Sequence, residues 1–214
     1  MNKHWKPIIR NKNKLFPYLI IDNWYSKKEE KAVWKELDFY LSAEKDNLQR
    51  AENTIVATKN GKPLGKSYRI YPNLIYNPSN KFLHSNILRF MYKQRSKEFH
   101  DLIVKAIPMA RNFPLTNKDS TLISYYEEGD SYKEHTDCLQ FTCLIWFHKN
   151  PKKYKGGDFY FSDNKELVES KHNRLVIFPS YYWHSVKKLK FNNKKCKLGD
   201  GRFTITHFYY TTVL

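Results

Sequence analysis

Apolar and polar residues follow a helical period in the first part of the chain. Beyond Ser26, apolar side chains recur every three or four residues, at Val33, Leu37 and Tyr40. Ser26 and Glu29 form an S-x-x-E capping box, which is typical of the first turn of a helix. The pattern therefore predicts an amphipathic helix that begins directly after Ser26.

Two further segments of this part have a recognisable pattern. The apolar run from Pro17 to Ile21 predicts a strand before the first helix. A second helical region, in two pieces, is predicted over about residues 81–107. Pro108 ends that region, because proline lacks the amide hydrogen that a helix interior requires.

From residue 120 the pattern changes to short runs of β-branched and aromatic residues, separated by Gly, Pro, Asn and Asp. The predicted strands cover residues 121–126, 140–147, 158–161, 174–178 and 202–211. Helices followed by many short strands indicate an α+β or mainly β fold of the sandwich or jelly-roll kind. Five of the seven glycines lie in this half, beside strand ends, where backbone geometry excludes a side chain.

Length and composition restrict the class of protein further. With 214 residues, we expect a single domain, 1–214, in which 1–119 form a helical support region and 120–214 most of the jelly-roll core. The three cysteines form no C-x-x-C pair, which argues against a disulfide framework and favours the cytoplasm. The apolar run near the start is too short for a membrane span, so we expect no membrane partner.

The formal net charge of +17 comes from 38 Lys and Arg against 21 Asp and Glu. Such a charge favours nucleic acid, a membrane surface or an acidic substrate as partner. The excess is mostly Lys, in a chain also rich in Asn, Ile, Tyr and Phe, so an A/T-rich genome accounts for it equally well. The basic segments are spread along the chain, and nucleic acid remains an alternative partner.

His135 and Asp137 are candidate metal ligands. Residues two apart in an extended segment point to the same side, so both side chains can reach one ion. His184, 47 residues after Asp137, is the candidate third ligand. Two His and one carboxylate leave coordination positions open, as an Fe(II) centre that binds a cosubstrate and O2 requires.

Four segments in order resemble the Fe(II)/2-oxoglutarate dioxygenases, most closely the prolyl 4-hydroxylase group. Tyr126–Asp137 resembles the Y-x-x-G…Y-x-x-H-x-D segment, and Gly156–Phe159 resembles the G-G-E/D-Φ turn, where Φ is apolar. Leu175–Val186 resembles the F-P-S…H-x-V strand. Gly201–Thr204 resembles the G-x-R-x-S/T strand, with one residue fewer between Gly and Arg. The resemblance covers about residues 120–212.

The resemblance implies a double-stranded β-helix, a jelly-roll barrel with the N-terminal helices packed outside. It implies that Fe(II) is held by His135, Asp137 and His184. It also implies that 2-oxoglutarate is the cosubstrate beside O2, with ascorbate as a stimulant. The residues implied to hold 2-oxoglutarate are Arg202, through a guanidinium fork on the distal carboxylate, and the hydroxyl groups of Tyr126 and Thr204.

Some details of the pattern leave alternatives open. Tyr125 is an alternative to Tyr126 as the inward-facing residue. Trp146 stands near the place where some prolyl hydroxylases have a tyrosine, so what assists Arg202 is open. Tyr182 and Trp183 precede a metal ligand and are either substrate-binding residues or strand packing.

Other segments have plainer interpretations. The Lys-rich segment 187–199 lengthens the spacing between His184 and Arg202, and we expect it at the far end of the cosubstrate, away from iron and substrate. Residues 60–65 form a plain turn, or else a lid or hairpin over the site. The remaining candidates for ligands are interpreted as structural or exposed residues: His148, His172 and His207.

We therefore predict an Fe(II)- and 2-oxoglutarate-dependent hydroxylase that acts on a prolyl residue of a peptide or protein. The alternatives are AlkB-like oxidative dealkylation of nucleic acid, a free amino-acid hydroxylase, and a jelly-roll binding module without turnover. The Arg202 strand lacks the second arginine of AlkB-type strands, whereas the +17 charge fits them. The oligomeric state is left open by the sequence.

Overall fold

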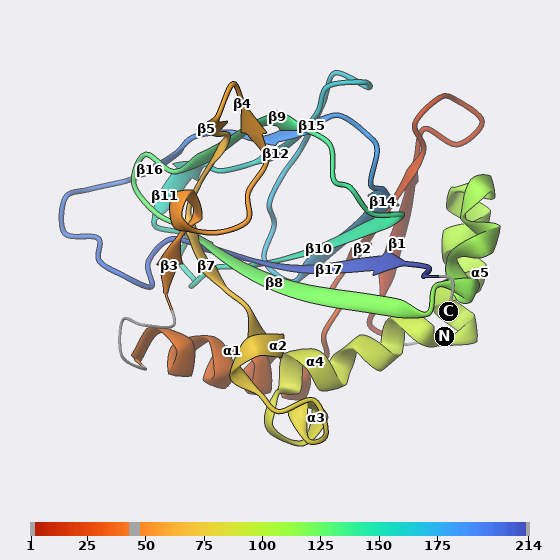
Figure 1. Ribbon diagram of the computed structural model, residues 1–214, viewed down its shortest axis with the longest axis horizontal. Coiled ribbons are helices and arrows are strands. Elements are labelled where there is room, and N and C mark those ends of the chain that lie inside the picture. The colour runs from red at the N-terminus through yellow and green to blue at the C-terminus, as the bar shows by residue number, and fades with distance from the viewer. Residues whose placement is uncertain (1–2, 43–47, 213–214) are drawn as a thin grey trace.

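The computed structural model describes residues 3–42 and 48–212, and two antiparallel sheets dominate it. Figure 1 shows the larger sheet crossing the molecule, with the helices on one side of it and the smaller sheet on the other. The larger sheet has the order β1 (Lys6–Arg10), β2 (Tyr18–Asp22), β14 (Arg174–Pro179), β10 (Phe141–Phe147), β17 (Arg202–Tyr210), β8 (Lys118–Tyr126), β7 (Tyr68–Ile70), β3 (Gln49–Arg50).

The smaller sheet and two additional strand pairs complete the β structure. The smaller sheet has the order β13 (Glu166–Val168), β12 (Phe159–Phe161), β15 (His184–Val186), β9 (Ser131–His135), β6 (Gly65–Lys66). The two additional pairs are β11 (Tyr154–Gly156) with β16 (Leu189–Phe191), and β4 (Thr58–Lys59) with β5 (Lys62–Pro63). Two facing sheets of this kind form the double-stranded β-helix that the sequence predicts.

The helices lie on the outer face of the larger sheet (Figure 1). The α-helices are α1 (Lys27–Ser42), α2 (Pro72–Ile75), α3 (Lys81–His84), α4 (Asn86–Phe90) and α5 (Lys97–Ala106). Short 3-10 helices cover Ala51–Asn53, Met91–Arg95 and Pro108–Leu115. The predicted region 81–107 is thus divided into four pieces rather than two, and α5 ends before Pro108 as expected.

The capping box predicted for α1 is present. The Ser26 amide donates to the Glu29 carboxylate at 2.8 Å, and the Glu29 amide donates to the Ser26 hydroxyl at 3.4 Å. The predicted apolar face, with Val33, Leu37 and Tyr40, is fully buried against the larger sheet. This face fixes the helix on the sheet and leaves the opposite side of the sheet free for the site.

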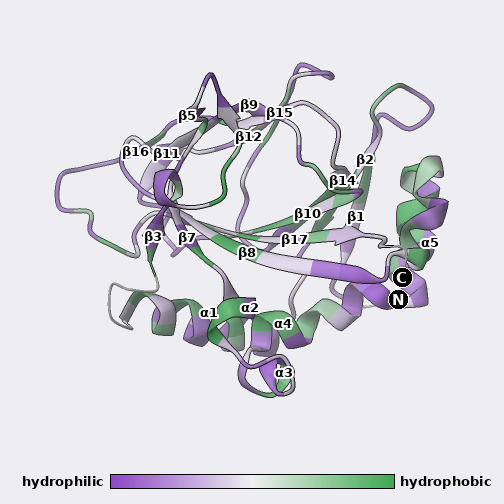
Figure 2. Ribbon diagram, in the orientation of Figure 1, coloured by the Kyte–Doolittle hydropathy of each residue, from purple (hydrophilic) through white to green (hydrophobic). Residues whose placement is uncertain are grey.

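The alternation of side chains along the central strands creates two cores. In β10, Cys143, Ile145 and Phe147 pack against the helices, whereas Leu144 and Trp146 point toward the smaller sheet. Figure 2 shows the resulting concentration of hydrophobic residues on the central strands and on the helices, with the β4–β5 hairpin mostly hydrophilic. Both faces of β10 are therefore buried, which explains its nearly continuous apolar sequence.

The first 119 residues contribute more than the helical support that the sequence indicates. They supply β1, β2, β3 and β7 to the larger sheet and β6 to the smaller one. All five of these strands are only two to five residues long, so they leave little periodicity for a sequence pattern to reveal. The N-terminal part therefore forms both edges of the larger sheet, β1 and β3, and one edge of the smaller sheet, β6.

Residues 60–65 are part of a hairpin, which corrects the plain-turn interpretation. Asn60 and Gly61 connect β4 to β5, and both have positive φ, of 52° and 72°. Asn-Gly is the favoured pair for such a tight turn, because asparagine and glycine tolerate this conformation best. Val56 and Ala57, just before the hairpin, line the large cavity described below, so this segment covers part of the site.

Among the described residues, no helix has the length and apolar character needed to cross a membrane.

Candidate metal centre and cosubstrate pocket

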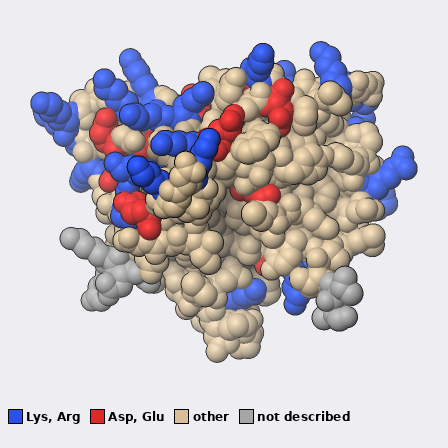
Figure 3. Space-filling model, turned by 45° about the horizontal axis from the view of Figure 1, so that its top comes forward, with Lys and Arg blue, Asp and Glu red and all other residues tan. Residues whose placement is uncertain are grey.

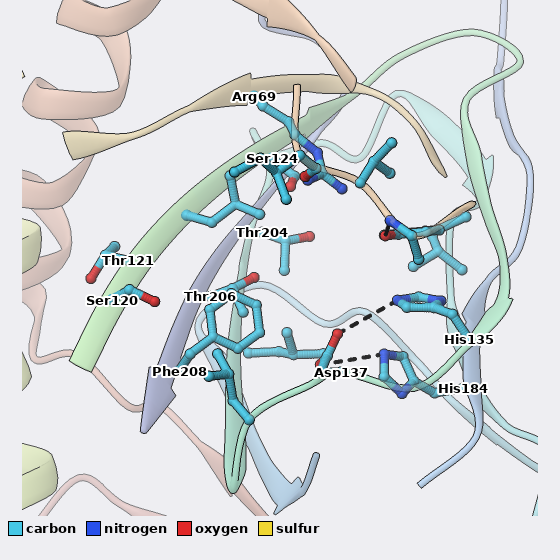
Figure 4. A pocket seen from close by; sticks show the side chains of 18 of the residues that line it. Arg69, Ser120, Thr121, Ser124, His135, Asp137, His184, Thr204, Thr206 and Phe208 are labelled. Carbon is cyan, nitrogen blue, oxygen red and sulfur yellow. Dashed lines mark hydrogen bonds and ion pairs between the residues drawn. The ribbon is translucent and has the colours of Figure 1, made fainter. Parts of the chain in front are cut away.

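The three predicted metal ligands meet on the inner side of the smaller sheet. β9 and β15 are antiparallel neighbours, and their register places His135 directly opposite His184. Asp137 follows two residues after His135, and its carboxylate oxygens lie 3.7 Å from His135 Nε2 and 3.6 Å from His184 Nε2. The three ligand atoms are all within 4.8 Å of one another, which is close enough to hold one ion (Figure 4).

Backbone carbonyls orient both imidazoles. His135 Nδ1 lies 2.8 Å from the Lys133 carbonyl oxygen, and His184 Nδ1 lies 2.8 Å from the Tyr182 carbonyl oxygen. A ring that donates its Nδ1 hydrogen in this way keeps the Nε2 lone pair for a metal. Both Nε2 atoms face Asp137, so the donor set fits a metal bound through two imidazoles and one carboxylate.

Burial keeps both histidines neutral at physiological pH. It lowers the pKa of His135 to about 4, with His184 as the next contribution, and it lowers the pKa of His184 to about 4. The same burial raises the pKa of the Asp137 carboxyl group, because its charged form loses contact with water. Neutral imidazoles are the form that binds metals, so the two histidines need no deprotonation at neutral pH.

Asp137 is held in place by Thr142 of β10 and by Ser180, which directly follows β14. The Thr142 hydroxyl donates to Asp137 Oδ2 at 2.7 Å and lies 2.8 Å from the Ser180 hydroxyl oxygen. The Asp137 amide donates to the Ser180 carbonyl oxygen at 2.9 Å. The carboxylate thus has a fixed direction even though Asp137 lies just beyond the end of β9.

Replacing Thr142 with valine is expected to weaken metal binding about 10- to 100-fold, the range typical of lost outer-shell hydrogen bonds. Titration of the metal-free protein with Fe(II) under anaerobic conditions measures this affinity. Thr206→Val is the matched control, because Thr206 lines the same cavity and donates no hydrogen bond to Asp137. Equal affinities for wild-type protein and Thr142→Val would contradict the orienting role.

The metal ligands open into a cavity of about 430 Å³ between the two sheets. Inward-facing residues of four adjacent larger-sheet strands line it in one row: Trp146 of β10, Thr204 of β17, Ser124 of β8 and Arg69 of β7. Figure 4 shows Arg69, Ser124 and Thr204 on the side of the cavity that faces the metal ligands. A cavity of this size is typical of small-molecule sites.

Arg202 is fully buried at the start of β17 without a carboxylate partner among the described residues. Its Nη1 donates to the Gly157 carbonyl oxygen, whereas Nε and Nη2 have no hydrogen-bond partner. The hydroxyl of Thr204 is also buried without a partner. Because an unpaired buried charge is costly, these three donor atoms fit the distal carboxylate of 2-oxoglutarate.

Tyr126, rather than Tyr125, is the inward-facing tyrosine. Tyr126 lines the cavity, and the Arg202 guanidinium lies 4.5 Å from the centre of its ring. The Tyr125 hydroxyl points to the other side of β8 and accepts hydrogen bonds from the Gly199 and Gly201 amides. The Tyr126 interpretation is therefore supported by its position beside Arg202.

Gly201 allows β17 to start close to β8. A Cβ atom at this position would lie 2.0 Å from the Tyr126 carbonyl oxygen, and only glycine fits such an approach. Arg202 follows immediately and is paired with Tyr126 in the register of the two strands. The glycine of the G-x-R-x-S/T segment thus sets the depth at which the guanidinium enters the barrel.

Tyr182 and Trp183 lie away from the cavity. Tyr182 is buried in the inner core, and its hydroxyl donates to the Pro17 carbonyl oxygen at 3.1 Å. Trp183 is 48% exposed, and neither residue lines the cavity. Tyr182 therefore has the packing role that was the alternative to substrate binding.

The Lys-rich segment 187–199 lies at the Arg202 end of the site. Leu189–Phe191 forms β16 beside β11, and the Gly157 amide donates to the Lys188 carbonyl oxygen. None of the residues 187–199 lines the cavity. The distance of this segment from iron and substrate stays a prediction. His148, His172 and His207 are also absent from the residues that line the cavity.

Two residues near the site have no signal in the sequence motifs. Arg69 of β7 lines the cavity next to Ser124. Tyr154 of β11 is buried near Arg202. Burial raises the pKa of its hydroxyl group and the Arg202 charge opposes this rise, so Tyr154 is a candidate for the additional group near the distal carboxylate. Only strand pairing reveals them, because neither belongs to a motif.

Comparisons with known proteins agree with this geometry. Residues 121–210, which contain all three metal ligands and Arg202, match the model of the 2OG-Fe(II) oxygenase superfamily. No curated protein sequence matches the chain.

Three solved structures show the fold. A prolyl 4-hydroxylase of Pseudomonas putida is similar with 14% identity and a TM-score of 0.59, covering 93% of this chain and 95% of that one. The viral collagen prolyl hydroxylase of Paramecium bursaria Chlorella virus-1, solved with 2-oxoglutarate, has 14% identity and a TM-score of 0.54, covering 92% and 96%. A non-heme alpha-ketoglutarate-dependent epimerase from nogalamycin biosynthesis has 11% identity and a TM-score of 0.53, covering 91% and 77%.

A jelly-roll barrel with two His, one carboxylate and a buried arginine defines a non-heme iron oxygenase of the 2-oxoglutarate-dependent kind. The match of residues 121–210 to this family and the geometry of the site together indicate a 2OG-Fe(II) oxygenase, a dioxygenase whose cofactors are Fe(II) and 2-oxoglutarate.

Proposed function

We propose that the protein hydroxylates a prolyl residue of a peptide or protein. The reaction type is supported mainly by the open centre of two His and one carboxylate. The unpartnered hydroxyl of Thr204 lines the same cavity, and Arg202 lies next to Thr204 on β17. The substrate proposal is supported by the four prolyl-hydroxylase-like segments and by the similar prolyl 4-hydroxylase structures. The similar epimerase is the reason for keeping reaction class and substrate as separate questions.

Different residues bind the metal and the cosubstrate. Bound Fe(II) and 2-oxoglutarate supply, with O2, an oxidant that inserts oxygen into a C–H bond. His135, Asp137 and His184 hold the metal and leave positions open for the cosubstrate and O2. Arg202 and Thr204 orient the cosubstrate through its distal carboxylate.

The walls of the cavity limit the access of water. Leu144, Phe159 and Val186 are apolar residues that line the cavity, and Phe159 also stacks against the His184 ring at 5.2 Å. A dry site protects the oxidant from side reactions and strengthens the charge interactions of Arg202. The chain therefore contributes positioning and exclusion of water rather than a separate acid or base.

A second candidate is oxidative dealkylation of nucleic acid, which one surface feature favours. Figure 3 shows Lys and Arg side chains gathered on the half of this face that carries β3, β4, β5 and β16. The exposed lysines of these strands and of β6 include Lys59, Lys62, Lys66 and Lys190. A basic surface beside an oxygenase cavity is also suited to an acidic peptide, so charge alone does not decide between the candidates.

A side-by-side assay tests both candidates. Purified protein with Fe(II), ascorbate and 2-oxoglutarate is given a proline-rich peptide in one reaction and methylated single-stranded DNA in the other. We expect succinate release to rise with the peptide and mass spectrometry to show a product heavier by one oxygen. Demethylated DNA with an unchanged peptide would replace the proposal by the second candidate. No succinate, even uncoupled, would contradict the dioxygenase activity itself.

A further inference from the structure

Arg69 is a second buried arginine without a carboxylate partner. Its exposed fraction is 4%, compared with 0% for Arg202, and neither forms an ion pair with another described residue. Arg174, by contrast, pairs with Asp22 at 2.6 Å. An uncompensated buried guanidinium is costly, and the role assigned to Arg202 accounts for only one of the two.

The Arg69 side chain points into the cavity that contains the metal ligands. Arg69 is opposite Ser124, which is opposite Thr204, so the three residues face inward side by side. Figure 4 shows the guanidinium above Thr204, at the end of the cavity opposite Phe208. Nη1 donates to the Ile55 carbonyl oxygen at 2.6 Å, while Nε is buried without a partner.

The guanidinium is close to the metal centre. It lies 5.6 Å from the centre of the Tyr132 ring, and the His135 ring stacks against the same ring at 3.7 Å. One aromatic ring therefore connects Arg69 to a metal ligand. A group bound to Arg69 would therefore lie near the residues that would hold the metal.

Arg69 and Arg202 serve different ends of the site. Arg69 is two strands away from β17, which corresponds to about 10 Å, and Arg202 is a further two residues along that strand, about 7 Å. Their hydrogen bonds also diverge, because Arg69 donates to Ile55 before the hairpin and Arg202 donates to Gly157. A single carboxylate held by Arg202 therefore leaves Arg69 available for another molecule.

We propose that Arg69 binds a carboxylate of the substrate, and that the protein selects substrates with an acidic group close to the reacting carbon. The inference rests on the proposed function and specifies its substrate class. A guanidinium offers a planar fork that matches a carboxylate, and the Nε donor of Arg69 is free to complete it. Val56 and Ala57, which line the cavity after Ile55, cover the bound group from the hairpin side.

Two sources of this carboxylate are consistent with a prolyl substrate. One is the terminal carboxylate of a free amino acid or of a C-terminal proline. The other is the side chain of an Asp or Glu next to an internal proline. Both sources present a carboxylate to Arg69. Matched pairs of compounds, in which the carboxylate of one source is replaced by an amide, distinguish the two sources.

The experiment compares N-acetyl amino acids with their amides, and peptides containing Pro-Glu with those containing Pro-Gln. Substrate-stimulated succinate release and product mass are measured for wild-type protein, Arg69→Gln and Arg69→Lys. Binding of N-acetyl-L-proline and its amide to protein loaded with Zn(II) and 2-oxoglutarate is measured by calorimetry. Lys66→Gln is the control, because it removes an exposed positive charge from β6, the strand that precedes β7 in the chain, without touching the cavity.

We expect the acidic member of at least one pair to be preferred about tenfold or more by wild-type protein. Arg69→Gln should remove this preference, Arg69→Lys should retain part of it, and uncoupled turnover should keep its KM for 2-oxoglutarate. The inference would be overturned if Arg69→Gln kept the preference for the acidic compound. It would also be overturned if wild-type protein used both members of every pair equally, or if no pair stimulated succinate release. A selective rise in the 2-oxoglutarate KM would overturn it as well, because it would assign Arg69 to the cosubstrate.

The outcome for Arg69 is distinguishable from the outcome for the proposed function. If acids other than proline derivatives are preferred and Arg69→Gln removes that preference, the carboxylate site stands and prolyl hydroxylation is wrong. If proline compounds are hydroxylated regardless of the acidic group, prolyl hydroxylation stands and the carboxylate site is wrong.

Discussion

Replacing His184 with alanine is expected to abolish the release of succinate from 2-oxoglutarate. The His184 Nε2 atom lies 3.6 Å from Asp137 Oδ2, and together with His135 they form the donor set that the described residues provide. Loss of an outer-shell partner already costs up to about 100-fold in affinity or activity, and loss of a ligand should cost more. Succinate release and anaerobic Fe(II) titration measure the two effects.

His84→Ala is the control for this variant. His84 is exposed on α3 and stacks on Tyr76, outside the cavity. We expect it to retain wild-type turnover and metal affinity, and thermal unfolding of all three proteins checks that the fold is intact. Turnover by a folded His184→Ala protein at the wild-type rate would refute the ligand assignment.

The convergence of His135, Asp137 and His184 could be predicted from the sequence because the geometry is largely local. His135 and Asp137 are two residues apart in an extended segment, and His184 begins a strand whose neighbours are recognisable by their pattern. The central strands also follow the predicted runs, since β10 and β14 are apolar apart from Thr142 and Arg174, and β17 is rich in β-branched and aromatic residues. Where the chemistry depends on spacing along one strand, the sequence is sufficient.

The alternation of side chains identifies inward-facing residues only where a strand is unbroken, and not where the chain turns. Tyr126 is inward-facing because β8 continues without a break, so alternation separates it correctly from Tyr125. Tyr182 precedes His184 by two residues, yet the turn at 180–182 separates it from β15. Its ring therefore packs on Phe178 in the inner core instead of facing the cavity.

Arg69 was outside the reach of sequence analysis for a different reason. β7 has only three residues, and Arg69 stands in a run of Tyr, Ile and Ser that resembles none of the motifs. Its place opposite Ser124 depends on pairing with a strand more than 50 residues later. The identity of a neighbour at such a distance follows from topology and not from local pattern.

Unpaired buried charge links the two arginines to the function of the protein. Most charged side chains in the interior of proteins are paired, because desolvation of a lone ion is costly. Lys93 follows that rule, with Glu29 at 2.9 Å, whereas Arg69 and Arg202 do not. In the ligand-free protein, the desolvation of these two unpaired guanidinium groups lowers the stability of the folded state, and anionic ligands offset this loss. This free-energy term predicts how the arginines affect stability.

Replacing Arg202 with methionine is expected to leave the metal- and cosubstrate-free protein at least as stable as wild type. The substitution removes a fully buried charge that has no carboxylate partner among the described residues. Methionine is flexible enough to fill the space along the Tyr126 ring. Replacing a buried charged side chain with an apolar side chain of similar volume is neutral or stabilising. Thermal unfolding of the apo protein should therefore show no decrease in Tm.

The same substitution should remove the effect of 2-oxoglutarate. At about 100 times its Kd, a ligand stabilises the folded state by about 2.7 kcal/mol. For a chain of this size that energy corresponds to a rise in Tm of about 5–10 °C. Arg202→Met loses about two charged hydrogen bonds, about 3–6 kcal/mol together, so the rise should vanish and the KM should increase at least 100-fold.

Arg174→Met separates this expectation from the general effect of losing an arginine. Arg174 pairs with Asp22 on the neighbouring strand, so its loss should lower the Tm of the apo protein. Its distance from the cavity should leave the rise in Tm with 2-oxoglutarate intact. The two variants are thus expected to behave in opposite ways, and a normal 2-oxoglutarate response in Arg202→Met would show that another group holds the distal carboxylate.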